Sequence, residues 1–115
     1  MKKIEAFIRH EALDQLRDRL AGMGLPSMSV SEVKGSGRQE GYKESYRGAS
    51  GRIFLRPKLK LEMVVDDADL ERVLEAILEI ARTGEAGDGK VFVIPVEDAI
   101  RVRSGERGPG VLASH

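Results

Sequence analysis

The order of strand-like and helix-like patterns constrains the fold of this chain more than any other feature of its sequence. Two units follow each other, and each runs from a strand through a helix to a second strand. The strands alternate apolar and polar side chains, and the helices carry an apolar stripe. No repeat of fixed period accompanies this doubled order. The predicted ranges are strand 3–9, helix 11–23 and strand 28–34 in the first unit, and strand 58–65, helix 66–81 and strand 91–96 in the second.

This order predicts an α+β fold of the ferredoxin-like kind, in which both helices cover one face of a four-stranded antiparallel sheet. A chain of 115 residues suits one domain with one core, so we assign residues 1–115 to a single domain. Pro95 predicts that the strand 91–96 lies at an edge or contains a bulge. A further short strand at 100–103 would place Arg101 and Arg103 on one face. The residues that follow it, 104–110, are expected to be loose.

The sheet face without helices would carry alternating charges. Such a face is either a solvated surface or a surface for self-association, with lysines paired to glutamates of another subunit. Recognition of RNA is disfavoured, because only Phe7 is well placed for stacking on a base and 19 basic residues balance 19 acidic ones. The predicted residues of this open face are Glu5, Phe7, Arg9, Lys58, Lys60 and Glu62.

A glycine-rich stretch between the second helix and the last strand is the strongest chemical signal. It reads Thr83-Gly-Glu-Ala-Gly-Asp-Gly-Lys90. Glycines let successive N–H groups approach one anion, and Lys90 adds a positive charge, so the stretch indicates a phosphate-binding loop. It is not a Walker P-loop, since Val91 stands where Ser or Thr is required and a strand follows instead of a helix. The alternative is a helix C-cap and turn without a ligand.

The segment 35–56 is polar and glycine-rich, and it lacks a sustained apolar period. A loop of this length in so small a domain is commonly functional. Its arginines and tyrosines are residue types that contribute strongly to protein interfaces. The alternative is a plain connecting loop. The side chains that suggest an interface are Arg38, Gln39, Tyr42, Tyr46, Arg47 and Arg52.

Composition excludes several other classes of protein. The absence of cysteine rules out disulfides and thiolate metal sites, and His10 and His115 are too few to suggest a metal centre. Charges interrupt the N-terminus too early for a signal peptide, and no apolar run approaches the length of a membrane span. These features are compatible with a cytoplasmic protein.

Several motifs together resemble the PII signal-transduction (nitrogen regulatory P-II) protein family. The likeness extends from Met1 to about Arg107, and the second of the two family signatures, around 83–96, is intact. The matching stretches are Val33-Lys-Gly-Ser-Gly-Arg-Gln39, Tyr46-Arg-Gly-Ala49, Ala81-Arg-Thr-Gly-Glu-Ala-Gly-Asp-Gly-Lys-Val-Phe-Val93, Pro95-Val-Glu97 and Ile100-Arg-Val-Arg-Ser-Gly-Glu106.

The resemblance implies a homotrimer that binds ATP or ADP in clefts between subunits. It also implies three functional segments: a T-loop at about 37–55, a nucleotide-binding B-loop at about 82–90 and a C-terminal loop at about 101–115. The nucleotide-binding positions that it implies are Ser29, Gly35, Gly37, Arg38, Gln39, Glu62, Val64, Gly87, Asp88, Gly89, Lys90, Arg101 and Arg103.

The family also senses 2-oxoglutarate together with Mg²⁺ and ATP. By resemblance, Gln39 would coordinate the metal and Lys58 would pair with a carboxylate of the effector. The T-loop docks on transporters or enzymes, and the arginine matching Arg47, beside Tyr46, enters the pore of ammonium channels in members that bind them. No membrane insertion of the chain itself is implied, and a membrane association would come only through a transporter partner.

Departures from the family pattern concern the same loop. The uridylylated tyrosine of many members is replaced by Gly51, after Ser50, and the serine phosphorylated in some relatives corresponds to Ala49. Glu40 replaces a usual lysine beside the proposed 2-oxoglutarate pocket, where its charge would repel a dicarboxylate, and Tyr42 is also atypical.

We therefore expect a non-enzymatic trimeric sensor of ATP and ADP that regulates a partner such as an ammonium transporter or an enzyme of nitrogen metabolism. An alternative within the family senses another effector and regulates an inorganic-carbon or metal transporter. Two alternatives from other classes are a small nucleotide-using enzyme, for which Asp88 is the nearest candidate base, and a structural trimer that binds no nucleotide.

Overall fold

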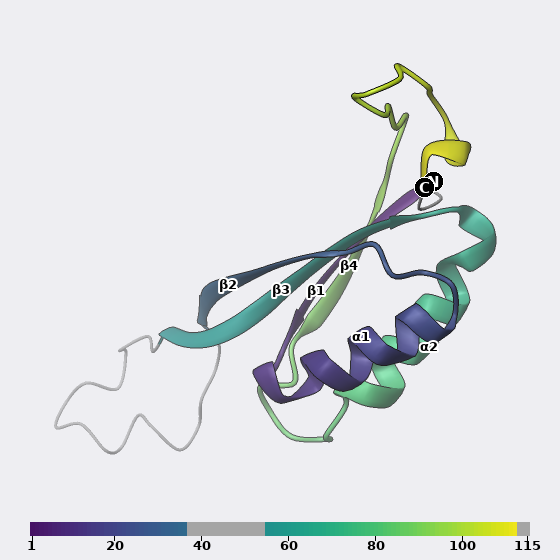
Figure 1. Cartoon of the computed structure of the whole chain (residues 1–115). Coiled ribbons are helices and arrows are strands. Elements are labelled where there is room, and N and C mark those ends of the chain that lie inside the picture. Colours follow the sequence, from purple (N-terminus) through teal and green to yellow (C-terminus); the bar gives the residue numbers. More distant parts are fainter. Residues whose placement is uncertain (37–54, 113–115) are drawn as a thin grey trace, which may run out of the picture.

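A computed structural model describes residues 1–36 and 55–112 of the chain. Four antiparallel strands form one sheet in the order β2-β3-β1-β4, and two helices lie side by side on one face of it (Figure 1). This arrangement confirms the predicted ferredoxin-like fold. The elements are β1 (Lys2–Ile8), α1 (Leu13–Gly22), β2 (Ser29–Ser36), β3 (Leu55–Val65), α2 (Leu70–Ala81) and β4 (Lys90–Pro95).

The alternation of the sequence decides which face of the sheet becomes the core. Ile4, Ala6 and Ile8 of β1 are at most 1% exposed, and so is Leu61 of β3. Their partners in the register carry the same pattern, since Ala6 lies opposite Leu61. Successive side chains of a strand point to opposite faces, so one face of the sheet is apolar throughout its two central strands.

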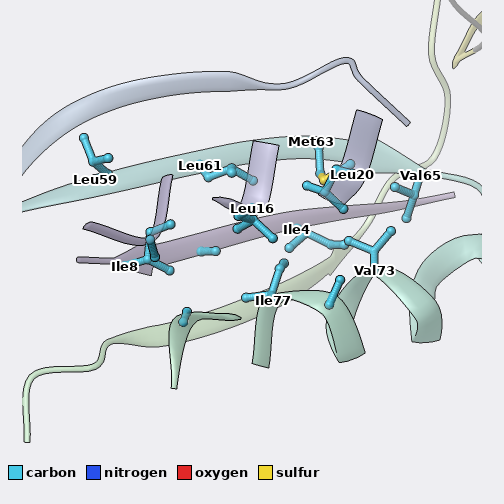
Figure 2. Packing of buried hydrophobic residues seen from close by; sticks show 14 residues of the cluster. Ile4, Ile8, Leu16, Leu20, Leu59, Leu61, Met63, Val65, Val73 and Ile77 are labelled. Atoms are coloured by element: carbon cyan, nitrogen blue, oxygen red, sulfur yellow. The ribbon is translucent and has the colours of Figure 1, made fainter. Parts of the chain in front are cut away.

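The helices close this core from one side. Leu16 and Leu20 of α1 are fully buried, as is Val73 of α2, and they meet the strand residues in one continuous cluster (Figure 2). Ile77 of α2 is also buried, and so is Ala76. A small residue at that position lets the helix approach the sheet closely. The helix layer therefore leaves the opposite face of the sheet uncovered.

Strands β2 and β4 form the two edges of the sheet, which confirms the edge position that Pro95 predicts. Each edge strand retains exposed apolar side chains. Val30 of β2 is 42% exposed, and Phe92 of β4 is 48% exposed. Neither edge is paired within the described residues, so both are available to another chain.

The segment predicted as a long loop begins later and ends earlier than residues 35–56. Gly35 lies opposite Arg56 and Ser36 lies opposite Leu55, so these four residues continue the β2–β3 pair. Backbone hydrogen bonds between strands do not require apolar side chains, so polar residues and glycine can extend a strand pair. The apolar periodicity of the sequence therefore does not indicate where such a pair ends.

The prediction of a strand at 100–103 was wrong, and so was the expectation of a loose segment at 104–110. Only an isolated bridge joins Ile100 to Arg107. Between them the chain reverses, because the N–H of Gly105 donates to the carbonyl of Arg101 and the N–H of Arg101 donates to the carbonyl of Glu106, both at 2.8 Å. Gly105 has φ +77°, which favours glycine. A short 3-10 helix, η4 (Pro109–Leu112), follows.

The part of the chain that the structure describes includes no helix long and apolar enough to cross a bilayer.

Candidate functional site

Asp88 determines the shape of the glycine-rich loop that precedes β4. One of its oxygens, Oδ2, accepts hydrogen bonds from the backbone N–H groups of Thr83 at 2.8 Å and Gly84 at 2.9 Å. Its other oxygen accepts from the Thr83 hydroxyl. These donors, the Thr83 hydroxyl first, stabilise the ionised carboxyl and hold the pKa of Asp88 well below its usual range. Asp88 therefore shapes the turn. A carboxylate that accepts so many hydrogen bonds is poorly suited to act as a general base.

Two glycines of this loop are required by its backbone. Gly87 has φ +97° and Gly89 has φ +103°, a region that residues with a Cβ rarely adopt. Gly89 also lies directly against the backbone of Phe7, in the strand next to β4. The sequence pattern predicted that glycines allow a close approach here, and the neighbour approached is the protein's own strand.

Cations from two other strands anchor the loop. Arg9, just after β1, donates from Nε to Asp88 Oδ1 at 3.2 Å and from Nη2 to the carbonyl of Ala86 at 2.9 Å. The Lys58 ammonium, from β3, donates to the carbonyl of Gly87. Burial, followed by the charge of Arg9, lowers the pKa of Lys58 from its usual value. Lys90 begins β4, is exposed, and makes no ion pair with any residue of the described ranges.

The remaining predicted site residues gather at the other end of the sheet. Ser29 of β2 lies opposite Glu62 of β3, and both line a hollow of about 570 Å³ together with Val64. Val111 and Leu112 of η4 form its far wall. The hollow combines a hydroxyl, a carboxylate and apolar walls, which are the groups that a planar heterocycle with polar edges needs.

Glu62 belongs to an ionic cluster on the open face of the sheet. Lys3 Nζ lies 2.8 Å from a Glu62 oxygen and 3.0 Å from a Glu5 oxygen, and Lys60 Nζ lies 3.4 Å from Glu62. The hydrogen bond that Lys3 donates to Glu62 lowers the pKa of Glu62 and raises the pKa of Lys3. Pairing between subunits was one of the two alternatives for this face; Glu5, Lys60 and Glu62 instead make ion pairs within one chain.

Arg101 and Arg103 follow β4 at this same end, but they do not share a strand face. The Arg101 guanidinium donates to Glu106 Oε1 at 3.2 Å and to the carbonyl of Val111 at 3.3 Å, so it is held beside η4. Arg103 is exposed in the turn, without an ion pair to a described residue. Arg107 makes a separate pair with Asp98 at 2.6 Å.

The predicted residues therefore form two groups. We call Gly35, Lys58 and the stretch 87–90 the loop group, since a Cβ on Gly35 would lie 3.6 Å from the side chain of Lys58, whose ammonium reaches Gly87. The second, which we call the hollow group, contains Ser29, Glu62, Val64, Arg101 and Arg103. Figure 1 shows the two ends well apart, with β4 running between them. The predicted residues Gly37, Arg38, Gln39, Tyr46 and Arg47 lie outside the described residues.

Arg9 contacts the loop group through Asp88, and sequence reasoning missed this role. We placed it on the open sheet face by alternation alone. The register pairs Phe7 with Lys90, so two residues further Arg9 comes opposite Asp88. Only the strand pairing carries this signal. Among residues 1–36 and 55–112, no group of three or more His, Asp or Glu side chains could hold a metal ion.

Comparisons with known proteins agree with this architecture. The model of the family "Nitrogen regulatory protein P-II" matches residues 1–106. A nitrogen regulatory protein P-II 1 from Methanothermobacter thermautotrophicus is 55% identical over 108 residues, which cover 94% of each chain. A nitrogen regulatory protein P-II from Rhodospirillum rubrum is 51% identical over 108 residues, 94% of this chain and 96% of the relative.

A solved structure supports the same assignment. The crystal structure of Arabidopsis thaliana PII bound to citrate superimposes with a TM-score of 0.78 at 37% identity, and the match covers 99% of this chain and 91% of that one. Sequence signatures, strand order and overall likeness all agree. The chain belongs to the nitrogen regulatory protein P-II family of signal-transduction regulators.

Proposed function

We propose that this protein is a homotrimeric regulator that binds ATP and ADP in clefts between subunits. The observation that carries the proposal is the separation of the loop group from the hollow group. The six residues of β4 span roughly 17 Å, and Lys90 and the residues after Pro95 lie at its two ends. One nucleotide that uses both groups must therefore lie between the loop group of one subunit and the hollow group of the next.

The chemistry of each group suits one part of the ligand. The amides around Gly87 and the ammonium of Lys90 suit phosphate oxygens, and Arg103 is an exposed guanidinium without a described ion-pair partner. The hollow at Ser29 and Glu62 suits the adenine and ribose. Gly35, Gly37 and Arg38 would close the cleft from the T-loop side. The unpaired edges β2 and β4 supply surfaces for assembly of the trimer.

We further propose 2-oxoglutarate as a second effector, with Mg²⁺ entering as the ATP complex and Gln39 as its side-chain ligand. Lys58 fits a role in binding a dicarboxylate. It lies beside Arg9, so two cations face the glycine-rich loop. The ammonium of Lys58 donates to the Gly87 carbonyl, a neutral acceptor that a carboxylate can replace. Glu40 opposes this role through its charge.

The output of the sensor would be the T-loop, about 37–55, with Tyr46 and Arg47 as partner-binding residues. Its target would be an ammonium transporter or an enzyme of nitrogen metabolism, reached from the cytoplasm. Glu40 and Gly51 favour one alternative, a divergent member that answers to another effector and regulates an inorganic-carbon or metal transporter. The chain itself would be neither an enzyme nor a nucleic-acid-binding protein.

Calorimetry with ATP and with ADP, together with the solution mass, tests the central proposal. We expect binding of both nucleotides and a mass of three copies. Absence of binding would leave a structural trimer, and a mass of one copy would exclude the intersubunit cleft. Turnover of ATP faster than about once per second would instead indicate an enzyme.

Repeating the ATP titration with 2-oxoglutarate and Mg²⁺ tests the effector. We expect ATP affinity to change when the effector is present, because two ligands coupled through one protein must affect each other. No change would favour the divergent alternative. A pull-down with wild type and Arg47→Ala would test the partner-binding role, which predicts a partner captured only by wild type.

A further inference from the structure

Arg9 holds the glycine-rich loop by its backbone as well as by its charge. Its Nη2 donates to the carbonyl of Ala86 at 2.9 Å while its Nε donates to Asp88 at 3.2 Å. The Arg9 side chain is 29% exposed and that of Asp88 is 22% exposed, so both contacts are partly shielded from water. The guanidinium thus joins two points of the loop, and the next carbonyl along, that of Gly87, is held by Lys58.

These anchors fix the direction of two amide groups. In a trans peptide unit the C=O and the following N–H point in opposite directions. With the Ala86 carbonyl turned toward Arg9, the N–H of Gly87 points away from it. With the Gly87 carbonyl turned toward Lys58, the N–H of Asp88 points away from that side chain. The N–H of Gly87 donates to no described residue, whereas the N–H of Asp88 faces the Glu85 carbonyl across the turn at 86–87 without forming a hydrogen bond of good geometry.

We propose that Arg9 is a positioning residue for phosphate binding: by holding the Ala86 carbonyl and the Asp88 carboxylate it aims the amides of Gly87 and Asp88 at the phosphate oxygens. The inference rests on the proposed function, because it assumes that the phosphates lie at this loop. Arg9 itself need not touch the nucleotide. A pair of aimed amides is the arrangement by which loops bind anions, and it works only if the loop is preorganised.

The two contacts of Arg9 require the planar guanidinium of arginine. Two donors on one rigid group reach two acceptors at once, whereas the single ammonium of lysine on a flexible stem satisfies one of them. Lysine would nevertheless keep the positive charge near the phosphates. Comparing the two residues therefore separates positioning of the loop from simple charge attraction.

The experiment compares full-length Arg9→Gln and Arg9→Lys with wild type, using calorimetry with ATP, ADP and adenosine. We expect both variants to bind ATP and ADP about tenfold or more weakly, as the loss of a hydrogen bond with a charged partner suggests. Affinity for adenosine, which has no phosphate, should stay at the wild-type value. Arg17→Gln is the matched control, since Arg17 pairs with Asp14 on the helix layer, and it should change nothing.

Three results would overturn the inference. The first is wild-type ATP affinity in Arg9→Lys, which would reduce Arg9 to a source of charge. The second is unchanged ATP affinity in Arg9→Gln. The third is an equal loss for adenosine and ATP, which would mean general damage to the fold.

A second measurement does not depend on nucleotide binding. Backbone NMR order parameters of Gly87 and Asp88 should fall from the rigid range, about 0.85, to below about 0.6 in Arg9→Gln. If wild type binds neither ATP nor ADP, the proposed function fails. Unchanged order parameters would show that Arg9 does not hold the loop.

Discussion

Gly89 lies so close to Phe7 that a Cβ atom on Gly89 would stand 1.6 Å from the Phe7 carbonyl oxygen. Since β1 is a central strand and its backbone cannot retreat, Gly89→Ala must displace the loop or the start of β4. A residue with a Cβ is also strained at φ +103°. We expect the free energy of unfolding to fall by about 3 kcal/mol or more, measured by chemical denaturation.

Gly22→Ala is the matched control for this substitution. Gly22 is the last residue of α1, and a Cβ there would meet nothing within 4 Å. Alanine favours helix, so this variant should be neutral or stabilised by up to about 1 kcal/mol. Equal stability of Gly89→Ala and Gly22→Ala would contradict the close approach of the loop to β1.

The core makes a prediction that does not depend on any ligand. Leu16→Ala removes a fully buried side chain between α1 and the sheet, so we expect a loss of about 2–5 kcal/mol in the free energy of unfolding. Gln15→Ala, one position earlier on the exposed side of the same helix, should stay within about 0.5 kcal/mol. A small effect of Leu16→Ala in thermal or chemical denaturation would mean that α1 does not pack as described.

The carboxyl of Asp88 makes stability depend on pH in the acid range. The Thr83 hydroxyl, followed by backbone donors and Arg9, lowers the pKa of Asp88 in the folded state. Because the pKa of Asp88 is lower in the folded than in the unfolded state, its ionised carboxyl stabilises the fold at pH values above the unfolded pKa of about 3.9. This contribution decreases as the pH falls below about 3.9. Asp88→Asn should therefore be less stable than wild type at pH 6, and the difference should shrink toward pH 2. A difference that does not depend on pH would contradict the assignment.

Lys90 and Arg103 test the phosphate site from its two ends. We expect Lys90→Ala and Arg103→Ala each to weaken ATP binding by about tenfold to a hundredfold, because each loses a charge-assisted hydrogen bond. The solution mass should remain that of the assembled protein. Arg19→Ala, which removes one positive charge from the helix layer, where Arg19 pairs with Glu79, is the control. Unchanged ATP affinity in both test variants would reject the phosphate assignment.

Glu106 would compete with a bound phosphate for Arg101. The Arg101 guanidinium lies 3.2 Å from Glu106, so a nucleotide that uses Arg101 must replace that contact. Exposed ion pairs are weak, up to about 1 kcal/mol, so Glu106→Gln should tighten ATP binding by at most about fivefold. Glu97→Gln removes the same charge from an exposed position nearby and should have no effect. Weaker ATP binding in Glu106→Gln would show that Glu106 supports the site instead.

Periodicity and motif together predicted most of the fold, for physical reasons that particular residues make clear. Ile4 and Leu61 alternate with charged neighbours, and alternation reports which face of a strand is buried. The strand predicted at Arg101 and Arg103 failed because two alternating residues cannot compete with the reversal at Gly105. The alternation of side chains does not indicate that the N–H of Arg101 donates to the carbonyl of Glu106, five residues further along the chain.

The turn of the glycine-rich loop was predictable because its residues are local in the sequence, and its contact with Arg9 was missed because that contact depends on strand pairing. The glycines and Asp88 of the loop follow each other in the sequence, so their turn could be foreseen. Arg9 contacts Asp88 across 79 positions of the chain, and only the β1–β4 register brings them together. The predicted strand 91–96, by contrast, already separated Lys90 from Arg101 along the chain.

That separation has a consequence for how the protein would respond in a cell. Under the proposed function, a lone subunit possesses only half of the groups that would hold a nucleotide, so occupancy would depend on the abundance of the protein itself as well as on the ligand. Binding to a site shared by neighbours also stabilises the assembly by mass action. Dilution should thus weaken nucleotide affinity and dissociate the subunits in the same concentration range, and saturating ATP should shift that range lower.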